Sequence, residues 1–387
     1  MRLCTAAMAL SAVLSILPAG AQSFVSLHGA LKIQGNRIVD AQGQGVTLRG
    51  MALYWSQWKP AFYNADCVKW LRDDWKCTVV RASMAVTDGG YLTNPDAEMA
   101  KVRTVVQAAI DLGIYVIVDF HETKNGNDHL TAAKKFFGDL SKEFGKVPNI
   151  IYETWNEPDN TMAWATAIKP YHEAVIPVIR ANSENIILCG TRNWSQNVDE
   201  AAANPITSSA NIAYTLHFYA TDHRESLRNV AQGALNKGIA LMVTEGGLSE
   251  ASGKGVIDTA QGRLWADFMD KNGIAWTNWS LADLEESSGA LKVGASAKGG
   301  WNESQMNPSG IWVRNRLRYA AATVSLGEPS ARKPARYLPS AGSLEAVRDA
   351  NGRLRLRMGK NAYSNPPVIP FINSHPSSRA SSPMRTE

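Results

Sequence analysis

Eight apolar, strand-like runs recur along this chain and constrain its fold more than any other feature. They are continuously apolar rather than alternating, which indicates strands buried on both faces and therefore paired in parallel. The runs cover 46–53, 78–84, 114–120, 150–155, 186–190, 212–218, 240–245 and 274–279. Helical patterns separate most of them, at 64–74, 96–112, 131–145, 161–182, 223–237 and 256–271, and a last helix is expected at about 307–325.

Two architectures alternate strands with helices in this way, the open doubly wound sheet and the closed eightfold barrel. Eight repeats favour the barrel, which typically needs roughly 250 residues. No glycine-rich phosphate loop follows the first strand, which argues against a dinucleotide-binding sheet. Residues 29–46 indicate two short strands around turns at Gly35-Asn36 and Gln42-Gly43. We therefore predict an α/β fold, a (β/α)8 TIM barrel with a short N-terminal β-hairpin.

The first 21 residues have the pattern of a secretory signal peptide. Arg2 is followed by an apolar stretch from Ala6 to Leu17 and by the small residues Ala19-Gly20-Ala21, which predicts cleavage before Gln22. The alternative is an amphipathic or membrane-anchoring helix, but the apolar run is too short to span comfortably. We expect a secreted, extracellular protein that has no membrane contact after cleavage.

Residues 327–387 form a basic tail rich in Pro, Ser and Arg, which we expect to be mostly disordered. Within it, 337–360 has the pattern of a turn and a strand. The tail contributes +6 to the formal net charge of +5, whereas 22–326 carries −2. A nearly neutral body suits an uncharged substrate, and no basic run with interleaved aromatics indicates nucleic acid. Residues 22–326 are the predicted catalytic domain.

Three of the four cysteines remain after signal cleavage: Cys67, Cys77 and Cys189. Because their number is odd, at least one is unpaired. Cys77 and Cys189 lie in or beside apolar runs, which predicts buried thiols. The spacing leaves a Cys67–Cys77 disulfide open.

Polar and aromatic residues follow the strand-like runs at their carboxyl ends, where barrels of this kind carry their active sites. One such residue means little, because a core strand normally ends in a polar loop. Ten residues from different strands that converge on one rim form a candidate site. They are Tyr54, Trp58, Arg81, His121, Asn156, Glu157, His217, Tyr219, Glu245 and Trp279.

Glu157 and Glu245 are the centre of this candidate site, because they follow the fourth and seventh strands. Cleavage of a glycosidic bond needs one protonated and one ionised carboxyl, and a separation of about 5–5.5 Å permits direct attack with retention of configuration. Arg81 is expected to keep Glu245 ionised, and Tyr219 to orient it. Asn156 offers its amide to the 2-hydroxyl of a sugar. His121 and His217 are expected to be neutral, in a shared proton network.

Other interpretations apply to the single residues. A glutamate that ends a strand is usually a surface residue, but Trp155-Asn156-Glu157-Pro158 is a rare and specific combination. Arg81 in an apolar run must be paired, for structure or for catalysis, and both histidines could be satisfied core residues. His121-Glu122 does not continue as His-Glu-x-x-His, and no cysteine pair has zinc spacing. We expect no metal and no cofactor.

Eight of the twelve tryptophans fall into two groups. Trp70, Trp75, Trp265 and Trp276 fall in helix or strand positions and are expected in the core. Trp55, Trp58, Trp279 and Trp301 lie at strand ends or in loops and are expected on the catalytic rim. Exposed indoles along a cleft suit a polysaccharide, because sugar rings stack on them.

These motifs resemble glycoside hydrolase family 5, subfamily 2, the bacterial-type endo-β-1,4-glucanases. The similarity runs from about Leu31 to about Ala322 through LRGMALYWSQW, DWKCTVVRASM, IYVIVDFHE, PNIIYETWNEP, YTLHFYA, VTEGG and WTNWSL. The resemblance implies that Glu157 is the acid/base, Glu245 the nucleophile and Trp58 a sugar-stacking residue. It also implies hydrolysis inside β-1,4-glucan chains with retention, without a cofactor. The implied supporting residues are Arg81, His121, Asn156, His217, Tyr219 and Trp279.

The chain departs from this family pattern at four positions that bear on the substrate. Phe120 and Gly246 replace aromatic residues, Tyr54 stands where some members have His, and Leu284 replaces a lysine that commonly reaches the substrate. The expected function is that of a secreted, monomeric, retaining endo-β-1,4-glucanase whose partner is a polysaccharide. The alternatives are mixed-linkage glucan, mannan or xylan as the polymer, or a non-catalytic glycan-binding barrel, against which the two glutamates argue.

Overall fold

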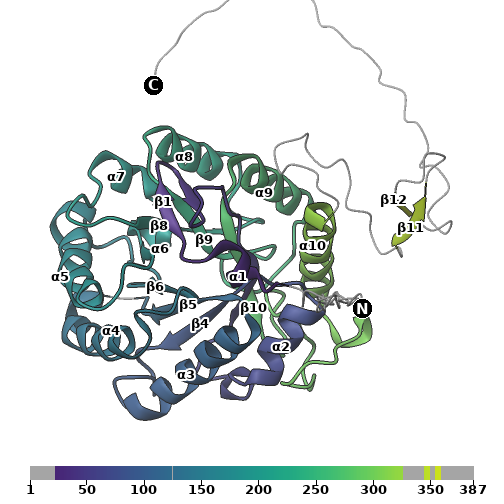
Figure 1. Ribbon diagram of the computed structural model, residues 1–387, viewed down its shortest axis with the longest axis horizontal. Helices are drawn as coiled ribbons and strands as arrows, with labels where there is room; N and C mark the ends of the chain where they lie inside the picture. The colour runs from purple at the N-terminus through teal and green to yellow at the C-terminus, as the bar shows by residue number, and fades with distance from the viewer. Residues whose placement is uncertain (1–21, 124, 326–343, 349–353, 359–387) are drawn as a thin grey trace, which may run out of the picture. The chain divides into compact units, whose positions relative to one another are not determined.

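A computed structural model describes residues 22–123, 125–325, 344–348 and 354–358 of the chain (Figure 1). The predicted signal peptide and most of the predicted tail lie outside these residues. The chain divides into two units, Met1–Pro334 and Ala335–Glu387. In the second unit, β11 (Leu344–Arg348) pairs antiparallel with β12 (Leu354–Met358), where the sequence indicated a turn and a strand.

The first unit contains a closed barrel of eight parallel strands, as predicted (Figure 1). Around the ring their order is β10, β3, β4, β5, β6, β7, β8 and β9, and β10 closes on β3. The strands are β3 (Arg49–Leu53), β4 (Val79–Ala85), β5 (Tyr115–His121), β6 (Ile150–Glu153), β7 (Ile187–Cys189), β8 (Ile212–Tyr219), β9 (Leu241–Gly247) and β10 (Ala275–Leu281). Every residue of β4 to β10 is buried, which explains the continuous apolar runs in the sequence.

Helices surround the barrel in Figure 1. The long ones are α2 (Ala65–Asp73), α3 (Pro95–Leu112), α4 (Leu130–Phe144), α5 (Lys169–Arg180), α8 (Glu225–Asn236), α9 (Thr259–Asn272) and α10 (Pro308–Ser325). The helix predicted over 161–182 is a π-helical turn, Trp164–Ile168, followed by α5. The connection from β7 to β8 carries two short helices, α6 (Arg192–Ser195) and α7 (Val198–Ala203). These two were not predicted, because such short segments show no apolar periodicity.

The N-terminal segment closes the end of the barrel where the strands begin. The hairpin of β1 (Lys32–Gln34) and β2 (Arg37–Val39) forms as predicted, and its turn residue Gly35 has φ +59°, which suits glycine. A short helix, α1 (Phe24–His28), precedes it, and the Val25 amide donates to the Gly113 carbonyl at 2.9 Å. Val25 and residues of the hairpin share a hydrophobic cluster with the first residues of the barrel strands. The opposite end, where the strands finish, is left for the site.

Two predictions about single residue types have clear outcomes. Cys67, Cys77 and Cys189 are all buried free thiols, so the Cys67–Cys77 disulfide does not form. Trp301 was wrongly expected on the rim: it is buried, its ring meets Trp75 edge-on at 5.9 Å, and its indole N–H donates to a backbone carbonyl. Within the described part of the chain, no helix is both long and apolar enough to cross a membrane.

Candidate active site

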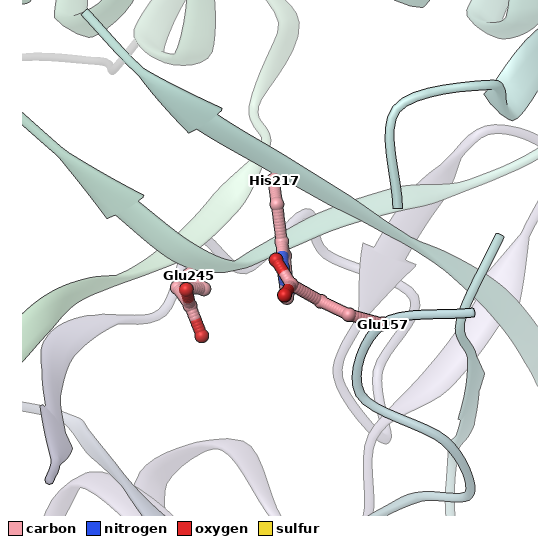
Figure 2. A group of neighbouring side chains, drawn as sticks. All are labelled: Glu157, His217 and Glu245. Carbon is pink, nitrogen blue, oxygen red and sulfur yellow. The ribbon is translucent and has the colours of Figure 1, made fainter. Parts of the chain in front are cut away.

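The two predicted carboxyl groups meet at the end of the barrel where the strands finish. Glu245 lies on β9, and Glu157 lies four residues after β6. One carboxylate oxygen of each lies within 4.8 Å of the other and of a ring nitrogen of His217. Figure 2 shows both carboxyl groups turned toward the same space, with the His217 side chain pointing at Glu157. Side chains from distant parts of the sequence therefore converge as the barrel topology predicts.

Arg81 on β4 is the cation of the site, and its side chain is fully buried. Its Nε donates to Glu153 Oε2 at 2.7 Å, its Nη1 to Glu245 Oε2 at 3.3 Å, and its Nη2 lies 2.9 Å from Asp119 Oδ2. Burial alone lowers the pKa of Arg81, but the negative charges of Asp119, Glu153 and Glu245 outweigh it and raise that pKa. The guanidinium is therefore permanently charged and satisfied by ion pairs.

Asp119 and Glu153 were missed by the sequence analysis. Both are fully buried, and both belong to apolar strands, β5 and β6. A charged residue inside an apolar run must find a partner, which is the reasoning that singled out Arg81. Applied to the same runs, it would have found these two carboxyl groups as well.

The side-chain amide of Asn156 is hydrogen-bonded through its oxygen, whereas its nitrogen is unpaired. Its Oδ1 accepts a hydrogen bond from Arg81 Nη2 at 2.6 Å, which fixes the orientation of the amide. Its Nδ2 is buried without a partner in the structure. A buried donor without a partner costs free energy, so this N–H group is prepared for an acceptor from outside, such as a sugar hydroxyl.

Glu245 is held as an acceptor on both of its oxygens. Tyr219 donates its hydroxyl to Oε1 at 2.5 Å, and Arg81 approaches Oε2. Burial raises the pKa of Glu245, and the charge of Glu157 raises it further. When Glu157 takes up a proton it loses its charge and no longer raises the pKa of Glu245. Glu245 is therefore ionised more readily when Glu157 is protonated.

Glu157 is a carboxyl group that holds a proton at neutral pH. Burial raises its pKa to about 8, because Arg81 opposes the shift only in part. Its Oε1 lies 2.8 Å from His217 Nδ1, and about 16% of its side chain stays exposed. The group is thus an acid that substrate can reach. Two carboxyl groups whose environments separate their pKa values are the pattern of an acid and a base.

A chain of hydrogen bonds assigns the tautomer of His217. Glu153 is ion-paired with Arg81, so it accepts the Thr244 hydroxyl proton at 2.6 Å. Thr244 Oγ1 can then only accept from His217 Nε2, at 2.9 Å. Burial lowers the pKa of His217 to about 4, so the ring is neutral. Its Nδ1 therefore carries no proton and accepts a hydrogen bond. Glu157 can donate that hydrogen bond only in its protonated form.

His121 belongs to a different hydrogen-bond chain from His217, although the sequence analysis expected one shared network. Its Nδ1 lies 2.6 Å from Asp119 Oδ2, the oxygen that also pairs with Arg81. Burial lowers its pKa, and the charge of Arg81 lowers it further. Its ring stacks on Trp279 with centroids 5.2 Å apart and planes 6° apart. The two chains meet only at the Arg81 ion pairs.

Aromatic rings extend from the centre along the mouth of the barrel. Trp279 packs against Tyr54 with ring centroids 5.3 Å apart, and Tyr54 against Trp58 with centroids 6.3 Å apart. Trp58 is 51% exposed. Trp194, which was not among the predicted site residues, is 39% exposed and belongs to α6 after β7. Because β3 and β7 are four positions apart in the ring, Trp58 and Trp194 lie on opposite sides of the mouth.

Among the described residues, the donor set that could hold a metal ion consists of Glu157, His217 and Glu245. Two carboxylates and an imidazole suit a transition metal. Glu157 and His217, however, are already joined by a hydrogen bond, and Glu245 by bonds to Tyr219 and Arg81. The absence of a metal in the working site stays a prediction.

Comparison with known proteins agrees with this geometry. The family model described as Cellulase (glycosyl hydrolase family 5) matches residues 39–285. The chain belongs to glycosyl hydrolase family 5. An endoglucanase of Clostridium saccharobutylicum is 44% identical over 79% of this chain and 68% of its own length. Endoglucanase A of Evansella cellulosilytica is 46% identical over 72% of this chain and 58% of its own length, so the chain spans roughly two thirds or less of these relatives.

Solved structures of the family share the barrel. One from Cytophaga hutchinsonii is 50% identical, covers 79% of this chain and all of its own, and has a TM-score of 0.78. The catalytic domain of an endoglucanase from Thermobifida fusca is 33% identical, with a TM-score of 0.72 over 76% of this chain and 99% of its own. A variant of that domain was solved in complex with cellotetraose.

The tautomer of His217 gives a prediction for Thr244 in this family 5 protein. In Thr244→Val, His217 Nε2 loses its acceptor, so the ring can move its proton to Nδ1 and donate to ionised Glu157. Hydrogen bonding to the charged form lowers a pKa, so the pKa of Glu157 should fall from about 8 toward the ordinary glutamate range. Carboxyl ¹³C NMR titration, with Glu157→Gln identifying the signal, measures it. Thr244→Ser keeps the hydroxyl and should titrate like the parent; an unshifted pKa in Thr244→Val would refute the tautomer.

Proposed function

We propose that residues 22–326 form the catalytic domain of a retaining endo-β-1,4-glucanase that works without metal or organic cofactor. The observation that carries the proposal is the approach of the Glu157 and Glu245 oxygens to within 4.8 Å. Carboxyl groups of retaining glycosidases stand about 5–5.5 Å apart, whereas those of inverting enzymes leave room for a water. The short separation therefore supports direct attack by a carboxylate.

The two carboxyl groups take unlike roles in the proposed double displacement. Glu157 donates its proton to the glycosidic oxygen as the bond to the anomeric carbon breaks, and a Glu245 oxygen forms a bond to that carbon. Glu157, now a carboxylate, then takes a proton from water, whose oxygen displaces Glu245. The raised pKa of Glu157 and the two donors on Glu245 support this assignment.

Neighbouring groups support both steps. His217 Nδ1 accepts from the acid form of Glu157 and so keeps its proton in place before the reaction. Asn156 Nδ2 is free to donate to the 2-hydroxyl of the reacting sugar, a contact that strengthens in the transition state. Tyr219 and Arg81 stabilise Glu245 when it leaves as a carboxylate. Trp279 and Tyr54 offer apolar surface beside the centre.

The endo mode of action is supported by the aromatic residues on the two sides of the mouth. A glucan chain that stacks on both Trp58 and Trp194 passes across the glutamates instead of ending at them. Cleavage then falls inside the chain. The relatives named endoglucanase and the cellotetraose complex of the Thermobifida fusca variant support β-1,4-glucan as the polymer.

Replacing either glutamate tests the catalytic assignment. Glu157→Gln should lower kcat by roughly 10²–10⁴-fold, because general acid or base groups contribute that much. Glu245→Gln should lower it at least as far, because it removes the nucleophile. The rates are measured on soluble cello-oligosaccharides. Glu225→Gln, at the exposed start of α8, is the matched control and should keep the parental rate. Near-parental hydrolysis by either active-site variant would show that the roles are wrong.

The polymer and the stereochemistry are tested together. Carboxymethylcellulose, barley glucan, mannan and xylan are digested in parallel, and early products of cello-oligosaccharides are followed by NMR. We expect the highest rate on a β-1,4-glucan and the β-anomer as the first product. Several polysaccharides are compared because Tyr54 and Leu284 depart from the family pattern, so the preferred polymer can differ from that of the relatives. Hydrolysis of mannan alone would overturn the glucanase assignment, and a first product in the α form would exclude retention.

We also propose that the enzyme is exported and acts outside the cell, where its polymeric substrate lies. Cleavage before Gln22 leaves α1 intact, and α1 belongs to the segment that closes the barrel. N-terminal sequencing of the exported protein should begin at Gln22. A protein that retains residues 1–21 after export would contradict the signal peptide.

A further inference from the structure

Lys59 and Asp283 join two loops that come from opposite ends of the barrel sequence. Lys59 Nζ donates to the Asp283 carboxylate at 2.8 Å and to the Asp283 backbone carbonyl at the same distance. The side chains keep 27% and 19% of their surfaces exposed. Lys59 follows β3, and Asp283 follows β10, the neighbour of β3 in the ring. The pair thus spans the place where the barrel closes.

Asp283 is itself firmly placed. Its second carboxylate oxygen accepts the Gly294 amide at 3.0 Å, and its backbone forms a bridge with Leu291. Leu291 forms a further bridge with Met306, close to the start of α10. The loop after β10 is therefore an ordered anchor. Lys59 lies in a tight turn in which Trp58 and Lys59 both donate their amides to the Trp55 carbonyl, at 3.1 and 3.0 Å.

This turn carries Trp58, whose ring depends on its backbone for its position. The ring is 51% exposed and contacts Trp55 and Tyr54, which are themselves only partly buried. A half-exposed ring has few packing contacts to fix it. Ser56 ties the start of the turn to Ser83 on β4, and the ion pair of Lys59 ties its end to the loop after β10, so Trp58 lies between two anchored points. An ordered side chain avoids the entropy cost of immobilisation on binding.

We propose that Lys59 and Asp283 are positioning residues, which hold Trp58 ready to stack a sugar remote from the glutamates. The Lys59–Asp283 pair contacts neither Glu157, nor Glu245, nor Arg81. Its effect therefore falls on substrates long enough to reach Trp58. This inference rests on the proposed glycanase function, because it assigns a role in binding the same polymer chain.

The test compares substrate lengths. Lys59→Met keeps most of the apolar stem and removes the charge. We expect it to raise KM for the hexasaccharide by roughly three- to tenfold, about the net contribution of one ordinary hydrogen bond, and to change KM for the trisaccharide far less. Asp283→Asn should have a similar but smaller effect, because the backbone carbonyl still accepts, and Lys59→Arg should recover much of the parental KM. Oligosaccharides are taken from the polymer that the parent hydrolyses fastest.

A double-mutant cycle with Trp58→Ala separates positioning from general stability. If Lys59 acts through Trp58, the double variant should bind the hexasaccharide no worse than Trp58→Ala alone. Lys135→Met is the matched control: it breaks the exposed Lys135–Asp139 pair on α4 and should leave every KM unchanged. Thermal unfolding shows whether each variant is folded.

Two results would overturn the proposal. One is an equal change of KM at all substrate lengths, and the other is additivity of Lys59→Met with Trp58→Ala. Either can occur while the parent enzyme hydrolyses its polymer and depends on both glutamates, so failure of this inference is distinct from failure of the proposed function. If Lys59→Met does not fold, Asp283→Asn supplies the same comparison.

Discussion

The site depends on one buried guanidinium. Arg81 is fully buried and contacts Asp119, Glu153 and Glu245, with Glu157 close enough to feel its charge. One positive charge among four carboxyl groups leaves an excess of negative charge in a largely buried region. Such an excess is relieved by uptake of a proton. Burial raises the pKa of Glu157 to about 8 and that of Asp119 to about 7, so Glu157 takes up a proton first, while Glu245 has both Arg81 and Tyr219 as donors.

The two neutral histidines fix which atoms of the site carry protons. His121 faces Asp119, and His217 lies between Thr244 and Glu157. Because both rings are buried near a cation, their pKa values lie below the ordinary histidine value. They therefore act as fixed donors and acceptors instead of additional charges. The proposed roles of Glu157 as acid and Glu245 as nucleophile thus follow from burial and hydrogen bonding around two chemically identical side chains.

The charged residues of the site and its exposed tryptophans lie on different parts of the barrel. Residues that set charge and proton position lie on strands or within a few residues of their ends, where neighbouring backbone fixes them: Arg81, Asp119, Glu153, His217 and Glu245. Trp58 and Trp194, which are exposed to solvent, lie beyond the strands, in the connections that follow β3 and β7. Of the four departures from the family pattern, Tyr54 and Leu284 fall in loops, whereas Phe120 and Gly246 lie on β5 and β9. Substrate preference can therefore vary while the chemistry is kept.

Sequence alone determined the eight strands, the closed barrel and the ten candidate residues, because apolar periodicity reports burial and parallel strands finish on one rim. It also identified Arg81, since a charge in an apolar run needs a partner. Only the tertiary structure decided which partners Arg81 has, which tautomer His217 adopts through Thr244, that Trp301 is buried, and that Lys59 meets Asp283. Those facts depend on which strands are neighbours around the ring and how loops fold over its mouth. Residues as far apart as 59 and 283 leave no trace of their contact in a local pattern.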